Sequence, residues 1–317
     1  MPVVSPVLDQ INDQIVDEIV ELKNRRHAVI LAHHYQDSEI QDLADSIGDS
    51  LELSRKAQEF TGDVIVFCGV KFMAETAKVL NPNRTVILPD IEAGCSLVDA
   101  CRVQDIRAFR ARNPDYVIVS YINTSVEVKA ESDILCTSSN AVKIVNSIPR
   151  DKPILFLPDV NLGSWVKRMT GRENMRLWQG SCILHNTFAA RRLVKARSEH
   201  PGALVAAHPE CPAEVLALAD FIGSTSAIVD WCVGASSSEI IVMTESGVSH
   251  SLHKAAPEKT FYFLANENCN CSECPHMKRN TLEKLRDALA NLAPRIEIPA
   301  DILRRAAIPI DRMLGVK

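Results

Sequence analysis

The segment from Asn268 to His276 has the composition of a metal-binding site. It places Cys269, Cys271 and Cys274 within six residues and ends in Cys-Pro. That ending is typical of ferredoxin cluster motifs. A Cys-x2-Cys pair can also be half of a zinc site or a redox dithiol. The chain offers no second compact pair to complete a zinc knuckle. The spacing therefore favours an iron–sulfur cluster and leaves zinc and redox chemistry open.

Two isolated cysteines have surroundings that suit the same chemistry. Cys95 lies in Glu92-Ala-Gly-Cys, and Cys182 lies in Trp178-Gln-Gly-Ser-Cys-Ile-Leu-His185. Glycine lets the backbone approach a bulky inorganic group, although each cysteine alone is more often a buried thiol in a glycine turn. Together with Cys274 they would supply three thiolates. A four-iron cluster with three protein ligands keeps one iron open as a Lewis acid.

Polar residues two apart form three pairs: His33 and Tyr35, Tyr121 and Asn123, and His208 and Glu210. Each pair follows a run that reads as a strand. On extended backbone, side chains two apart face the same side. The first two pairs can present two groups to one ligand, and the third joins a protonatable ring to a base.

Hydroxyl groups stand at turns that lead into expected helices. Ser50 lies in Ile47-Gly-Asp-Ser-Leu51, where hydroxyl and N–H groups suit a phosphate or carboxylate. Ser138, Ser224 and Thr225 repeat this arrangement further along the chain. Because serine and threonine caps are common, these residues gain meaning only as a set.

The elements that position these residues alternate between short β-branched runs and helical patterns. Nearly continuous apolar strands separated by helices are typical of parallel sheets covered on both faces. Such a pattern predicts an α/β fold. The expected strands are Val29–Ala32, Val64–Phe67, Val86–Leu88, Val117–Ser120, Ile134–Cys136, Ile154–Leu157, Leu204–Ala206, Phe221–Gly223, Ile240–Met243 and Phe261–Phe263.

The pattern occurs three times. The first strand of each repeat ends in one of the polar pairs, and a cysteine follows 62, 61 and 66 residues later (33 to 95, 121 to 182 and 208 to 274). We align the ends of the second strands at 68, 137 and 224, and those of the third at 90, 159 and 245. A single doubly wound sheet would not explain a cysteine after each repeat. We therefore expect three related α/β units.

Ligands of parallel α/β sheets bind beyond the carboxyl ends of the strands. Three units that face one another would bring their strand ends and their cysteines, Cys95, Cys182 and Cys274, to one central cavity.

The composition excludes several classes of protein. A net charge of −5 argues against a broad nucleic-acid surface, and no run approaches the 18 apolar residues of a membrane span. The first residues do not have the pattern of a signal peptide, and ten cysteines then argue against a disulfide framework. We expect a cytoplasmic protein.

These features together resemble the quinolinate synthase family, the four-iron–four-sulfur enzymes of de novo NAD biosynthesis. The similarity runs from about residue 10 to the C-terminus. It is carried by Ile30–Gln36, Gln41–Leu51, Val66–Lys78, Ala93–Ser96, Tyr121–Thr124, Thr137–Ala141, Gly180–His185, His208–Cys211, Gly223–Thr225 and Cys274–Leu282.

The resemblance implies a fold and a domain division. The family has three homologous parallel-sheet α/β domains around a pseudo-threefold axis, with a central active-site cavity. In this chain the domains would be 1–104, 105–188 and 189–279, with helices in 280–317 packing back on the first.

The resemblance also implies a reaction, which condenses iminosuccinate with dihydroxyacetone phosphate to give quinolinate, phosphate and water. An L-aspartate oxidase would be a functional partner. One [4Fe-4S] cluster per subunit would be held by Cys95, Cys182 and Cys274. The substrate would be bound by His33, Ser50, Tyr121, Ile122, Asn123, Ser138, His208, Pro209, Glu210, Ser224 and Thr225. The expected catalytic groups are Tyr35, Tyr121, Glu210 and His185.

The sequence departs from the family pattern at two places. Many relatives have asparagine where His34 stands, which supports a structural role for His34. Some relatives have Cys-x2-Cys-x2-Cys where this chain has Cys269-x-Cys271-x2-Cys274. A regulatory disulfide suggested for some members is therefore not expected here.

Overall fold

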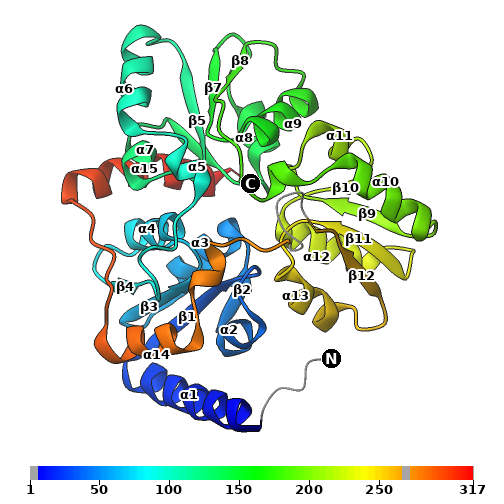
Figure 1. Ribbon diagram of the computed structural model, residues 1–317. Helices are drawn as coiled ribbons and strands as arrows, with labels where there is room; N and C mark the ends of the chain where they lie inside the picture. Colours follow the sequence, from blue (N-terminus) through cyan, green and yellow to red (C-terminus); the bar gives the residue numbers. More distant parts are fainter. Residues whose placement is uncertain (1–5, 266–271, 317) are drawn as a thin grey trace.

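Three parallel sheets, each covered by helices, make up the computed structural model of the protein (Figure 1). The structure describes residues 6–265 and 272–316, with side chains from residue 13 onward. Cys269 and Cys271 lie outside the described residues. The sheets confirm the predicted α/β class and the threefold repeat.

The first unit is formed by the N-terminal elements of the chain. Its elements are α1 (Pro6–Arg25), β1 (Ala28–His33), α2 (Ser38–Leu43), β2 (Ser46–Gly48), α3 (Ser50–Glu59), β3 (Val64–Cys68), α4 (Lys71–Leu80), β4 (Thr85–Ile87) and α5 (Ser96–Asp99).

The second unit repeats this order of strands. It contains α6 (Val103–Arg112), β5 (Val117–Tyr121), α7 (Val126–Ala130), β6 (Ile134–Cys136), α8 (Ala141–Ser147), β7 (Ile154–Leu157), α9 (Val160–Thr170), β8 (Met175–Leu177) and the short 3-10 helix η1 (His185–Thr187).

The third unit is followed by two C-terminal helices. It contains α10 (Ala190–Glu199), β9 (Leu204–Ala207), α11 (Ala213–Leu216), β10 (Phe221–Ile222), α12 (Thr225–Gly234), β11 (Glu239–Met243), α13 (Val248–Ala255), β12 (Thr260–Phe263) and η2 (Met277–Arg279). The C-terminal helices are α14 (Leu282–Asn291) and α15 (Ala300–Gly315).

All three sheets have the same strand order. They run β2-β1-β3-β4, β6-β5-β7-β8 and β10-β9-β11-β12, so the first strand of each unit lies between the second and the third. Every pairing is parallel, with registers such as Ala28 opposite Val64 and Val117 opposite Ile154. The loops after the strands of each unit therefore meet at one edge of its sheet.

Our alignment of the first repeat is wrong by one strand. β2 was not predicted, because the three residues Ser46-Ile-Gly48 carry no apolar run; β8 was missed for the same reason. Cys68 therefore ends a third strand rather than a second one, and residue 90 follows a fourth strand. The end of β2 at Gly48 is the true counterpart of Cys136 and Ile222.

The units are joined by packing and by the C-terminal helices. Figure 1 shows the three sheets as lobes around a common centre. One apolar cluster continues through all three units, including Phe67, Phe156 and Val242. α14 packs on α1 and β3 of the first unit, whereas α15 packs on α7 and β6 of the second and α4 of the first. The exact domain boundaries stay a prediction.

Among the described residues, no helix combines the length and the apolar character that crossing a membrane requires.

Candidate functional site

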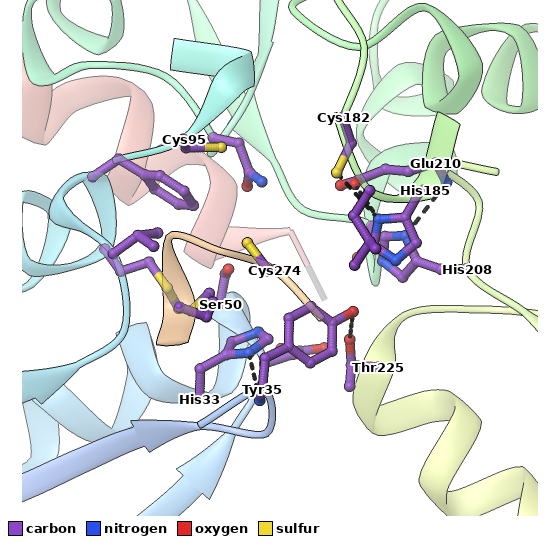
Figure 2. A pocket seen from close by; sticks show the side chains of 18 of the residues that line it. His33, Tyr35, Ser50, Cys95, Cys182, His185, His208, Glu210, Thr225 and Cys274 are labelled. Carbon is purple, nitrogen blue, oxygen red and sulfur yellow. Dashed lines mark hydrogen bonds and ion pairs between the residues drawn. The ribbon is translucent and has the colours of Figure 1, made fainter. Parts of the chain in front are cut away.

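A pocket draws its lining from all three units. It contains the three cysteines and ten of the other predicted residues, several of which are visible in Figure 2. Those ten are His33, Tyr35, Ser50, Tyr121, Asn123, Ser138, His185, His208, Glu210 and Thr225. The tertiary structure thus assembles side chains that are up to about 240 residues apart in sequence (His33 to Cys274).

Three predicted substrate residues do not line this pocket. Ile122 is buried in the apolar core, where its N–H donates to the Cys136 carbonyl. Ser224 caps α12, and its hydroxyl accepts from Ala227 N–H at 3.4 Å. Pro209 is buried between His208 and Glu210.

The three cysteine loops are held by the same main-chain hydrogen bond. In each unit, an N–H from the turn after the third strand donates to the carbonyl two residues before the cysteine. The bonds are Lys71 to Ala93 (2.8 Å), Val160 to Gly180 (2.8 Å) and Ser246 to Ser272 (2.9 Å). This repetition makes Cys95, Cys182 and Cys274 structurally equivalent.

The cysteine sulfurs face the same space, as Figure 2 shows. Main-chain amides two or three residues further on point at each sulfur: those of Leu97 and Val98, of His185, and of His276 and Met277. Amides in this position favour the thiolate. Burial nevertheless raises the pKa of all three thiols, that of Cys95 to about 12.

This donor set fits a soft metal centre. Buried thiols with raised pKa values lose their protons readily only when a cation compensates the charge, and thiolates are the ligands of iron–sulfur clusters. Cys95, Cys182 and Cys274 could therefore hold such a group. Its surroundings in the first unit are apolar, with Val70, Phe72 and Met73 among the lining residues.

A second potential ligand set overlaps with this one. One atom each from Cys182, His185 and Glu210 lies within 4.8 Å of the others, a spacing that could hold a metal ion. However, His185 Nδ1 and a Glu210 oxygen are 2.9 Å apart and already paired. This set is therefore both a hydrogen-bonded group and a second candidate for a metal site.

Glu210 is the centre of the polar part of the pocket. The Tyr121 hydroxyl donates to one of its oxygens at 2.7 Å, and His185 Nδ1 pairs with the other. Burial alone would raise the pKa of Glu210, but His208, His185 and the Tyr121 hydrogen bond outweigh it and lower the pKa. Glu210 is therefore ionised at neutral pH.

A continuous chain of hydrogen bonds connects Glu210 to Tyr35. In the neutral tautomer that donates from Nδ1, the Nε2 of His185 accepts from the Thr244 hydroxyl at 2.9 Å. Thr244 Oγ1 lies 2.7 Å from the Tyr35 hydroxyl, which lies 2.8 Å from Thr225 Oγ1. The charge on Glu210 thus orients each proton of this chain towards itself.

The remaining rings are held neutral by burial. Burial lowers the pKa of His208 to about 4 and that of His33 well below its ordinary value. It raises the pKa values of Tyr35 and Tyr121 above 10. At neutral pH the pocket therefore contains the neutral imidazoles of His33 and His208, the protonated phenols of Tyr35 and Tyr121 and the carboxylate of Glu210, which is a set suited to moving protons.

Hydroxyl groups lie at the ends of the second strands of the three units. Ser50 begins α3, Ser138 follows β6, and Thr225 begins α12. Asp49 caps α3 through the amides of Leu51 and Glu52, and also accepts from the Ser139 hydroxyl at 2.7 Å. The three units thus offer neutral donors to an anionic ligand from three sides.

Sequence reasoning missed several residues of the site. Thr244 links two predicted acid–base groups, but a lone threonine at a strand end carries no motif. Asp49 and Met277 line the pocket without a predicted role. Residues 70–73 lay within a stretch that matched the family pattern but was given no function.

Five other cysteines are buried and do not line the pocket. They are Cys68, Cys101, Cys136, Cys211 and Cys232, and all are buried. Burial raises their pKa values.

Comparisons with known proteins agree with the predicted resemblance. A family model described as quinolinate synthetase A protein matches residues 17–315. The chain is 54% identical over 295 residues to a quinolinate synthase of Microcystis aeruginosa, covering 93% of this chain and 92% of the relative. Quinolinate synthases of Gloeothece citriformis (55% over 295 residues; 93% and 91% covered) and Prochlorococcus marinus (52% over 298; 94% and 89%) are also similar.

We predict that His34 makes the protein sensitive to acid. Burial lowers its pKa from 6.5 to about 4, against the attraction of Asp49 and Asp230. The unfolded chain binds this proton near pH 6.5 and the folded chain only near pH 4, so stability is lost as the pH falls between these values. At pH 5 the loss is about 2 kcal/mol relative to pH 8.

His34→Asn removes this titration, because asparagine can keep a hydrogen bond to Ser226 or Ser251 without binding a proton. Urea denaturation at pH 8 and pH 5 should show that the variant loses about 2 kcal/mol less than the wild type. Equal losses in the two proteins would contradict the prediction.

Proposed function

Because the chain belongs to the quinolinate synthetase A family, we propose that it is a quinolinate synthase acting on iminosuccinate and dihydroxyacetone phosphate. The products are quinolinate, phosphate and water. The observation that carries the proposal is the single pocket in which one cysteine from each unit meets an acid–base network. We place the protein in the cytoplasm, whose reducing conditions suit its free thiols.

We assign a [4Fe-4S] cluster to Cys95, Cys182 and Cys274. Three equivalent loops, amides directed at the sulfurs and the fit of buried thiols to a metal support this set over Cys182, His185 and Glu210. When bound, the cluster supplies an iron without a protein ligand, a Lewis acid for a substrate oxygen.

The substrates carry two carboxylates and a phosphate, which the pocket can bind with neutral donors. Ser50, Ser138 and Thr225 provide hydroxyl groups from the three units, and Asn123 adds an amide. His33 and His208 are neutral at pH 7, so each ring offers one N–H and one lone pair. Such donors bind anions without adding a charge that would resist release of the product.

Ring formation requires protons to leave carbon and to reach departing hydroxyl groups. Glu210 is the ionised base of the pocket, and it accepts a proton through His185 or directly from Tyr121. Tyr35 connects to the same base through Thr244. Tyr35, Tyr121 and His185 therefore act with Glu210 as one acid–base unit.

The chemistry of iminosuccinate implies a partner reaction. This imine forms by two-electron oxidation of aspartate, and we propose that an L-aspartate oxidase supplies it. Because the imine is reactive, it must reach this protein soon after it forms, which implies a functional link between the two enzymes.

The first prediction from the proposed function concerns iron. Anaerobically purified wild-type protein should contain about four irons and four sulfides per chain. Cys95→Ala, Cys182→Ala and Cys274→Ala should each lose the visible absorbance of the cluster and quinolinate formation. Cys136→Ala is the matched control, because Cys136 is a buried thiol outside the pocket. One zinc per chain, or loss of iron from the control, would contradict the ligand assignment.

The second prediction concerns the base. Glu210→Gln keeps the size of the side chain but cannot take up the proton, so kcat should fall by at least about 100-fold. The iron content should stay at the wild-type level. A variant with near-wild-type turnover would remove Glu210 from the mechanism.

The third prediction concerns the link between Tyr35 and His185. Thr244→Val replaces the hydroxyl by a methyl group of similar size and interrupts the chain, so kcat should fall about 100-fold with unchanged iron content. Thr244→Ser restores the hydroxyl and should keep most of the activity. Equal rates for the valine and serine variants would show that the hydroxyl carries no proton.

A further inference from the structure

Two carboxylates that do not line the pocket occupy corresponding places in the second and third units. Asp159 follows β7 and Glu245 follows β11, each directly before the residue whose N–H holds the cysteine loop. Both side chains are 0% exposed. Burying a carboxylate is costly unless hydrogen bonds satisfy it, so their bonds reveal why they are there.

Each carboxylate joins a cysteine to the start of a helix. Asp159 accepts from Leu162 N–H at 2.7 Å with one oxygen and from Cys182 N–H at 3.1 Å with the other. Glu245 accepts from Gly247 N–H at 2.6 Å with one oxygen and from Cys274 N–H at 3.1 Å with the other. The two units thus use different acids for the same pair of bonds.

The first unit lacks this arrangement. Its corresponding residue is Val70, and in the described part of the chain no carboxylate accepts from the Cys95 amide. The loop of Cys95 is instead tied to that of Cys182. The Ser96 hydroxyl accepts from Ile183 N–H at 3.1 Å and donates to the Ser181 carbonyl at 3.4 Å.

We infer that Asp159 and Glu245 are positioning residues for the metal-binding cysteines Cys182 and Cys274. Each carboxylate fixes the peptide plane of its cysteine against a helix N-terminus and thereby fixes the direction of the Cα–Cβ bond that carries the sulfur. Because the Ser96 hydroxyl bonds to the main chain on both sides of Cys182, the hydrogen bonds of Asp159 also stabilise the loop of Cys95. This inference rests on the proposed cluster site, and it names residues behind the ligands rather than further ligands.

Helix capping alone does not account for this geometry. A cap of α9 needs one carboxylate oxygen, and a cap needs no acid that is completely buried. The cap does not use the second oxygen of Asp159, and this buried oxygen accepts from the cysteine amide instead of being left unsatisfied. In the third unit, the longer side chain of Glu245 accepts the same bond from a cysteine amide. This repetition supports a role at the cysteine.

The test uses Asp159→Asn and Glu245→Gln, which keep size and replace one oxygen by an NH2 group. An amide group then faces a main-chain N–H, so one of the two bonds is lost. Anaerobically purified variants are exposed to an iron chelator, and the decay of the visible absorbance is followed. Outer-shell partners of metal ligands typically contribute at least about 10-fold to metal retention, so iron should leave about 10-fold faster than in the wild type.

Glu75→Gln is the matched control. Glu75 is also a buried carboxylate that accepts a main-chain amide, from Val126 at 3.1 Å, but that amide belongs to α7 and not to a cysteine loop. This variant should release iron at the wild-type rate. Folded Asp159→Asn and Glu245→Gln proteins that release iron no faster than Glu75→Gln would overturn the inference.

The outcome is separable from that of the proposed function. A wild-type protein without iron would overturn both, whereas iron-loaded variants that retain iron normally would overturn the positioning role alone. If the variants do not fold, amide hydrogen exchange of the iron-free wild type decides. The amides of Cys182 and Cys274 should exchange more slowly than that of Cys95, and equally fast exchange at all three would overturn the inference.

Discussion

The structure depends on one main-chain hydrogen bond that occurs three times. In each unit, the turn after the third strand donates to the carbonyl two residues before a cysteine. Main-chain bonds do not depend on side-chain identity, so the same bond forms between different residues: Lys71 and Ala93, Val160 and Gly180, and Ser246 and Ser272. It brings three distant cysteines into equivalent positions, and the pocket follows from that equivalence.

A second constraint is the ionised carboxylate of Glu210 inside that pocket. A buried charge must be compensated, and Glu210 is compensated by Tyr121 and His185 rather than by a cation. This choice has a chemical consequence, because every hydroxyl connected to Glu210 turns its proton towards it. The other rings are buried and neutral. The main polar feature of the pocket wall is therefore the chain of hydrogen bonds from Glu210 through His185 and Thr244 to Tyr35.

Much of the fold was predictable where strands are apolar and long enough. Ten of the twelve strands in the described part of the chain correspond to apolar runs in the sequence, and the first strand of each unit ends in a polar pair that reaches the pocket. β2 and β8 are three-residue strands held by pairing with a neighbour, so the sequence alone shows no signal for them. Missing β2 displaced the alignment of the first repeat by one strand. Asp159 and Glu245 were aligned as strand ends but given no function, and Thr244 was given none either, because their partners lie 23, 29 and 59 residues away.

The amino-acid sequence by itself determined the α/β class, the threefold repetition, the cysteines and most residues that line the pocket. These features follow from local spacing: apolar runs define strands, and residues two apart share a face. Only the tertiary structure decided which groups touch. In the structure, Ile122, Pro209 and Ser224 do not line the pocket. Thr244 lies between His185 and Tyr35. Asp159 and Glu245 accept from the amides of Cys182 and Cys274. The reason is physical: a hydrogen bond requires contact within about 3 Å, and contacts between distant segments arise only when the three units pack against one another.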